Sequence, residues 1–173
     1  KDTSRGLGDV YKRQIINDSD EMRKVYLNIF KKESVVIAYG ATVRKSEDPS
    51  VINQWLITPK EYYLVVGRMI PDNNADIIVK GFLASSSTKK MVVVGDVFYK
   101  DIYADSLKAL KDVRLIFTGY VNDPDVLAAL YNHCYVYVHG HEYGGTNPTM
   151  IKAMAYGCAI LALNTVFNKE MLN

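Results

Sequence analysis

Five short apolar runs, rich in β-branched residues, dominate the hydrophobic pattern of the chain from Tyr62 onward. They follow one another about every 20 to 30 residues, with stretches of helical spacing between them. Continuous apolar strands that alternate with helices are typical of a parallel sheet buried on both faces. The pattern therefore predicts an α/β fold, a parallel sheet with helices on both faces. The predicted strands are YYLVVG (62–67), MVVVGD (91–96), VRLIFTG (113–119), CYVYVHG (134–140) and CAILAL (158–163).

Capping signals and polar composition place the remaining elements. Asp123-Pro124 and Asn147-Pro148 each pair a capping side chain with a proline suited to the first helical position, so each predicts a helix start. SDEMRKVYLNIF (19–30) has helical spacing behind a serine cap, and ESVVIAYG after it predicts a short strand ending at Gly40. Residues 41–61 are mostly polar, hold two prolines and lack a clear period, which predicts a linker or long loop.

Composition excludes several classes of protein. The net charge of +2 is too small to indicate a nucleic-acid partner, and the longest apolar runs of four to six residues are too short to cross a bilayer. Neither a Walker sequence, a G-x-G-x-x-G fingerprint nor a G-x-S-x-G elbow is present. His139 and His141 share a face of their predicted strand, but no third ligand is placed near them, so we expect no metal site.

The two ends of the chain do not look like protein ends. Residues 1–14, KDTSRGLGDVYKRQ, show no helical or strand period and resemble a translated sequencing adapter, so we expect them to contribute nothing to the fold. The chain stops at EMLN inside a predicted helix. We therefore expect a fragment of a longer protein.

Two stretches at predicted strand ends have the chemistry of an anion site. Arg68 follows the first strand of the sheet, and its guanidinium suits phosphate oxygens, although a local ion pair with Asp72 is an equal alternative. In HEYGGTNPTMIK (141–152) the glycines leave the backbone bare where a strand turns into a helix. Free N–H groups at such a helix start attract anions. Because ligands bind beyond the carboxyl ends of parallel strands, we expect both stretches to hold one diphosphate.

The segments VVGRMIPDNN, MVVVGD, LIFTGYVNDPDVLAALYNHCYVYVHG and HEYGGTNPTMIKAMAYGCAILALNTVFNKEML resemble retaining glycosyltransferases of family 4, as does IAYGA before them. The combination GGTNP, AMAYG and LALNTVFNKE is similar to a bacterial, rhamnosyltransferase-like branch. The resemblance implies the donor-binding half of a GT-B enzyme, an incomplete Rossmann-like sheet. It also implies that residues 15–40 are the last helix and strand of an acceptor domain, 41–61 a linker, and 62–173 a truncated donor domain.

The same resemblance assigns roles to individual residues. Glu142 matches a glutamate that contacts the donor sugar and, with Arg68, is implied to be catalytic. Asn73 stands where the family has a diphosphate-binding lysine, and Lys152 stands where it has a ribose-binding glutamate, with nine intervening residues instead of seven. The implied donor-binding residues are Gly67, Arg68, Asn73, Tyr120, Val121, Glu142, Gly144, Gly145, Thr146, Asn147 and Lys152.

Lys152 leaves three interpretations open. It pairs with the diphosphate, it forms an ion pair with Glu142, or it is solvated in a diverged copy of the enzyme. An ammonium only donates hydrogen bonds and cannot accept from a ribose diol as a carboxylate does. A lysine near a helix N-terminus is disfavoured by about 0.3–1 kcal/mol unless an anion is close, which favours the diphosphate.

The implied activity is transfer of a sugar from a nucleotide-diphospho-sugar, without cofactor or metal, to a glycan or lipid-linked acceptor in cell-surface polysaccharide synthesis. The resemblance further implies a cytoplasmic protein at the inner face of the membrane, and a fragment inactive by itself. A GT-B-type sugar-nucleotide epimerase and a non-catalytic, flavodoxin-like module such as a receiver domain are the alternatives. A receiver needs clustered acidic residues at its strand ends, where this chain has Arg68 and Gly119.

Overall fold

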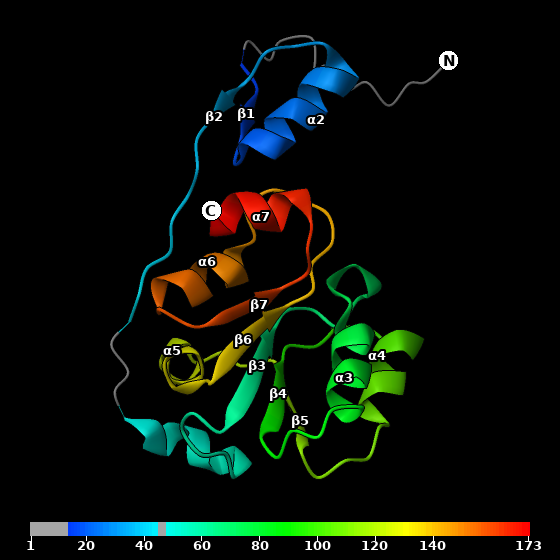
Figure 1. Cartoon of the computed structure of the whole chain (residues 1–173), viewed down its shortest axis with the longest axis vertical. Coiled ribbons are helices and arrows are strands. Elements are labelled where there is room, and N and C mark those ends of the chain that lie inside the picture. The colour runs from blue at the N-terminus through cyan, green and yellow to red at the C-terminus, as the bar shows by residue number, and fades with distance from the viewer. Residues whose placement is uncertain (1–13, 45–47) are drawn as a thin grey trace.

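The computed structural model describes residues 14–44 and 48–173, and its larger part is a five-stranded parallel sheet (Figure 1). All five predicted strands form, and every neighbouring pair is parallel, so the predicted sheet is confirmed. The sheet order is β5-β4-β3-β6-β7. The strands are β3 (Tyr62–Val66), β4 (Lys90–Val94), β5 (Leu115–Gly119), β6 (Val136–His139) and β7 (Ile160–Ala162).

Helices cover both faces of this sheet because side chains alternate along its strands. On one face Val65 and Val93 pack with residues of α3 (Ala75–Leu83) and α4 (Ile102–Lys108). On the other, Leu64 and Val92 pack with α5 (Pro124–His133) and α6 (Pro148–Ala155). In Figure 1 the two helix pairs lie on opposite sides of the strands. A last helix, α7 (Val166–Leu172), follows β7.

The strand order separates two kinds of doubly wound sheet. Numbered from β3, the order is 3-2-1-4-5, the order of a Rossmann-type half, whereas flavodoxin-like domains have 2-1-3-4-5. The alternative of a flavodoxin-like module is therefore wrong. The order reverses between β3 and β6, and such a reversal is where these sheets bind ligands.

At that reversal, β3 and β6 diverge toward their carboxyl ends. They pair only through Tyr63↔Val136 and Leu64↔Tyr137, whereas β3 and β4 pair through five positions. Beyond the divergence, η2 (Pro71–Asn73) and Asn74 bridge back to β6. Three consecutive residues, 72–74, hydrogen bond to three others, 140–142, through one backbone and two side-chain contacts.

Two helix starts follow the sequence signals. The side chain of Asp123 accepts from the backbone N–H of Asp125 at the start of α5, and that of Asn147 accepts from Thr149 at the start of α6. Each cap is followed by a proline at the first helical position, as predicted. The cap of α6 matters for function because it fixes the turn that ends at Asn147.

Residues 14–44, the N-terminal unit, form β1 (Ile16–Asn17), α2 (Asp20–Phe30) and β2 (Val35–Val36). The predicted helix 19–30 is confirmed, with Ser19 as its N-cap. The predicted strand is shorter than expected, because among the described residues it pairs only with the two-residue β1. Figure 1 shows this unit beyond α7, and residues 37–44, which follow β2, run down the side of the molecule. None of the residues of α2 is buried.

The segment 41–61 is not only a loop. It contains the 3₁₀ helix η1 (Pro49–Trp55), whose Ile52 is fully buried against α5 and the sheet, as is Ile57 nearby. The predicted linker therefore belongs in part to the core of residues 48–173, the sheet unit. Residues 1–13 and 45–47 lie outside the described residues, and with them most of the predicted adapter segment. Of that segment only Gln14 is described, and it is exposed.

No helix in residues 14–44 or 48–173 combines the length and the apolar character needed to cross a bilayer.

Candidate functional site

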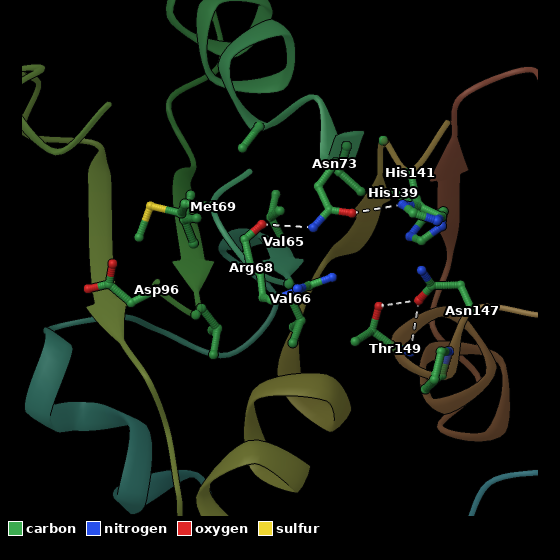
Figure 2. Close-up of a pocket in the computed structure, with 18 of the residues that line it drawn as sticks. Val65, Val66, Arg68, Met69, Asn73, Asp96, His139, His141, Asn147 and Thr149 are labelled. Atoms are coloured by element: carbon green, nitrogen blue, oxygen red, sulfur yellow. Dashed lines mark hydrogen bonds between the residues drawn. The ribbon is translucent and has the colours of Figure 1, made fainter. Parts of the chain in front are cut away.

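A pocket of about 570 Å³ lies where β3 and β6 diverge, beyond the carboxyl ends of the strands (Figure 2). It is lined by the ends of β3, β4 and β6, by the loop after β5 and by the start of α6. Most of the residues predicted from the sequence line this one pocket. They are Gly67, Arg68, Asn73, Tyr120, Val121, Gly144, Gly145, Thr146 and Asn147.

Arg68 enters the pocket from the end of β3. Its side chain is exposed, and no carboxylate in the described part of the chain forms an ion pair with it, so the alternative pairing with Asp72 is wrong. Gly67 and Gly95 let the backbone pass closely here, because a Cβ on Gly95 would lie 2.1 Å from the carbonyl oxygen of Gly67. A guanidinium without a protein partner is free to bind an anion.

Asn73 uses its amide inside the protein. Its Nδ2 donates to the backbone oxygen of Arg68 at 2.7 Å, and its Oδ1 lies 2.9 Å from Nδ1 of His141 (Figure 2). Because Nδ2 is the donor, Oδ1 is the acceptor and the imidazole donates to it. Asn73 lines the pocket, yet its polar atoms hold the ends of β3 and β6 together.

The turn 144–147 reaches the pocket with its backbone, but two of its N–H groups are already used. The N–H of Thr146 donates to Oδ2 of Asp18 at 2.9 Å, and the hydroxyl of Thr146 donates to the backbone oxygen of Asp18 at 2.9 Å. Gly145 is required for this contact, since a Cβ there would lie 2.0 Å from Oδ1 of Asp18. The N–H of Asn147 donates to Sδ of Met171 at 3.5 Å. The expectation that the whole turn offers free donors is therefore corrected at Thr146 and Asn147.

Glu142 and Lys152, in contrast, do not line the pocket. The backbone of Glu142 is held by Asp72, and its side chain is exposed, because His141 before it occupies the pocket side of the chain. Lys152 lies one helical turn beyond Thr149, and the predicted ion pair with Glu142 is absent from the described part of the chain. Their binding roles stay predictions.

Several lining residues were not predicted as donor-binding residues, chiefly His139, His141 and Thr149. Burial, and secondarily the neighbouring His141, lowers the pKa of His139 to about 4. The sequence signal for the two histidines was the HGH (139–141) at the end of a predicted strand. Among the described residues, no group of three or more His, Cys, Asp or Glu side chains is placed to hold a metal ion.

An aromatic pair stands at the other side of the pocket. Phe98 and Tyr120 make an edge-on contact at 5.5 Å between ring centres, and both are exposed. Asp96, which follows β4, also lines the pocket and is paired with Lys108 at 3.0 Å. Burial raises the pKa of Asp96 more than any single contact lowers it, but the hydrogen bonds from Lys108 and from the N–H of Val97, together with the charge of Lys108, hold the pKa below its ordinary value. Exposed rings on a pocket rim can stack on a planar ligand group.

Solved structures similar to the chain include a glycosyltransferase and a protein with bound UDP-glucose. Anabaena Alr3699/HepE in complex with UDP-glucose has a TM-score of 0.79 and 17% identity, covering 92% of this chain and 47% of that one. TarM has a TM-score of 0.68 and 17% identity, covering 89% of this chain and 30% of that one. WaaG, a glycosyltransferase involved in lipopolysaccharide biosynthesis, has a TM-score of 0.66 and 14% identity, covering 86% of this chain and 44% of that one. The chain thus spans less than half the length of each, and at these identities the likeness shows the fold, which is GT-B-like.

Sequence comparison gives the family. No curated protein is significantly similar to the chain. Residues 60–173, well over half of its length, match the family described as "Glycosyl transferases group 1". The chain therefore belongs to the group 1 glycosyl transferases.

Proposed function

We propose that the pocket binds a nucleotide-diphospho-sugar and that the full-length protein transfers its sugar to an acceptor. The observation that carries this proposal is the convergence of Arg68 and the start of α6 on one pocket where the strand order reverses. Arg68 forms no ion pair within the described part of the chain. A guanidinium and a helix N-terminus together favour a diphosphate. Two further observations support it, namely the family and the UDP-glucose bound by the similar structure of HepE.

Within the pocket, the diphosphate lies between Arg68 and the backbone of Gly144–Asn147. The base lies toward Phe98 and Tyr120, whose exposed rings flank the pocket beside Val121. Arg68 then stabilises the negative charge that develops on the leaving diphosphate, the kind of interaction that is usually the largest catalytic contribution. The transfer retains the anomeric configuration and uses no metal in this proposal.

Glu142 contacts the donor sugar in the proposed complex, and this requires its exposed side chain to turn toward the pocket. Lys152 assists the diphosphate from one turn along α6. Substitution of Lys152 by Glu distinguishes the alternatives. Weaker binding of UDP-glucose supports the role with the diphosphate, whereas tighter binding indicates that Lys152 replaces a ribose-binding carboxylate and contradicts that role.

The N-terminal unit is, in this proposal, the end of an acceptor-binding domain. Apolar side chains such as Ile29, Phe30 and Ile37 are more than half exposed there, which suits a larger domain around them. The acceptor is then a glycan or a lipid-linked glycan in bacterial cell-surface polysaccharide synthesis, with the protein in the cytoplasm at the inner face of the membrane. The rhamnosyltransferase-like branch is part of the same proposal, as is the absence of transfer by the 173 residues alone.

Calorimetry on the 173-residue chain tests the donor site. We expect one of UDP, GDP and ADP to bind, and the Arg68→Ala variant to bind it about 10- to 100-fold more weakly, because a charged hydrogen bond is lost. Arg44→Ala is the matched control, since Arg44 is equally exposed but pairs with Asp125 away from the pocket. Equal affinity in both variants would remove Arg68 from the site, and no binding of any of the three would contradict the proposed function.

A further inference from the structure

A short chain of hydrogen bonds runs from β6 to the first turn of α6. Nδ1 of His139 lies 3.2 Å from the hydroxyl oxygen of Tyr137. That oxygen lies 2.8 Å from Oγ1 of Thr149, which in turn lies 2.8 Å from Oδ1 of Asn147. Tyr137 is fully buried and His139 nearly so, with 5% of its surface exposed.

The last contact fixes the direction of the others. Oδ1 of Asn147 also accepts from the backbone N–H of Thr149 at 3.0 Å, so this atom is the amide oxygen. The hydroxyl of Thr149 must then donate its one hydrogen to Asn147, and it can only accept from Tyr137. The hydroxyl of Tyr137 therefore donates to Thr149 and accepts from His139. Nδ1 of His139 consequently carries the proton.

With its proton on Nδ1, a neutral His139 presents only a lone pair at Nε2. That atom is buried and has no hydrogen-bond partner in the described part of the chain. His139 lines the pocket next to His141 and Asn147 (Figure 2). Burial lowers the pKa of His139 to about 4, so the ring stays neutral near pH 7 and keeps this lone pair.

We propose that Nε2 of His139 accepts a hydrogen bond from a hydroxyl of the bound nucleotide-sugar, and thereby selects donors that carry that hydroxyl. The inference rests on the proposed function. Phosphate oxygens cannot fill this place because at neutral pH they chiefly accept hydrogen bonds. The base is proposed beside Tyr120, on the opposite side of β3 from His139. A hydroxyl next to the diphosphate, on the ribose or on the transferred sugar, is the donor group that remains.

Three other side chains that line the pocket, those of Asn73, Asn147 and Asp96, have acceptors that are already engaged. Oδ1 of Asn73 accepts from His141, and Oδ1 of Asn147 accepts twice from Thr149. Asp96 is paired with Lys108. An unfilled acceptor in a site built for polyhydroxyl ligands discriminates strongly, because a ligand without the matching hydroxyl leaves a buried polar atom unsatisfied.

The first experiment determines the tautomer of His139 in the chain without ligand. Nitrogen-15 NMR of histidine-labelled protein distinguishes protonated from unprotonated imidazole nitrogens. We expect His139 to be protonated at Nδ1 and bare at Nε2, and Tyr137→Phe to release this preference because it removes the hydroxyl that Nδ1 donates to. A proton on Nε2 in the wild-type chain would overturn the inference whatever the ligand data show.

The hydroxyl that His139 accepts from is identified by removing hydroxyl groups from the ribose or from the sugar of the ligand. UDP is compared with 2′-deoxy-UDP and 3′-deoxy-UDP for the ribose, and UDP-glucose with its deoxyglucose analogues for the sugar. We expect one deletion to weaken binding to wild type by about tenfold, and by less than about threefold to His139→Leu. His139→Gln, whose side-chain oxygen can accept near the same place, should retain the discrimination and covers the case in which His139→Leu does not fold.

The outcomes separate the two proposals. Discrimination lost with His139→Leu for a ribose analogue or for a sugar analogue supports the inference and names the source of the hydroxyl. Equal discrimination in wild type and both variants overturns the role of His139 while leaving the donor site intact. Failure of wild type to bind any of UDP, GDP and ADP overturns both proposals.

Discussion

The sheet unit and the N-terminal unit are stabilised in opposite ways. The sheet unit has a buried apolar cluster on each face of its strands. The N-terminal unit has no buried residue in α2 and is fastened to the rest by polar contacts, from Asp18 to Thr146 and from Glu170 to the first N–H groups of α2. The comparison teaches that one unit carries its own core, while the other is positioned by a few hydrogen bonds at the edge of the pocket.

The sharpest test of this difference is a pair of truncations. Leu64→Ala should lower the free energy of unfolding by about 2–5 kcal/mol, because Leu64 is fully buried between the sheet and α5. Ile29→Ala should change it by less than about 0.5 kcal/mol, because Ile29 is 62% exposed. Urea denaturation measures both. A cost for Ile29→Ala comparable to that of Leu64→Ala would show that the N-terminal unit has a core after all.

Acid should weaken the sheet unit through His139. Its pKa is about 4 in the folded chain, against 6.5 ordinarily, so between these values the unfolded chain binds more protons. This contribution to stability is complete above about pH 6.5, falls as pH is lowered, and is lost by about pH 4, at a total of about 3 kcal/mol. Urea denaturation across this range measures it. His139→Gln should flatten the profile, and an unchanged slope would assign the acid sensitivity to other groups.

Gly145→Ala should loosen the junction of the two units. The added methyl group displaces the carboxylate of Asp18, with the loss of about 1–2 kcal/mol from its hydrogen bond to Thr146. Faster hydrogen exchange at Thr146 and in β1 is the expected signature. In an Asp18→Ala background the same substitution should cost much less, and equal costs in both backgrounds would contradict the contact.

The smallest effect is expected at α2. Glu170→Gln removes the negative charge that accepts from the backbone N–H groups of Asp20 and Glu21, at 2.6 and 3.0 Å. A carboxylate at a helix N-terminus contributes about 0.3–1 kcal/mol. The amides of α2 should exchange faster while those of β3 and β4 stay protected. Uniform loosening of both units would mean that they unfold together.

The sequence predicted the sheet better than the site, for physical reasons. The strands are continuous apolar runs, mostly buried in β3, β4 and β6, and that signal is local. β1 was missed because two residues carry no period, and η1 because Ile52 and Ile57 lie in an otherwise polar segment. Elements that owe their place to distant partners leave a weak local pattern.

The site shows the same limit. Arg68 and the turn before Asn147 were predicted because carboxyl ends of parallel strands meet at one edge. The outward direction of the Glu142 side chain was not predicted, because it follows from the hydrogen bonds between residues 72–74 and 140–142. Nor was the lone pair of His139, whose direction depends on contacts between a strand and a helix ten residues later.

Because β3 diverges from β6, the pocket widens toward its mouth, where three hydrogen bonds between residues 72–74 and 140–142 hold the two strand ends together. Within the sheet, only two residue pairs join β3 and β6. At the mouth, two side-chain hydrogen bonds, from Asn74 to Gly140 and from His141 to Asn73, and one backbone bond from Glu142 to Asp72 close it. Widening the mouth therefore breaks three hydrogen bonds and no strand ladder, and both apolar clusters stay packed. The width of the mouth is therefore set by these three hydrogen bonds and not by the sheet, and changing it costs little.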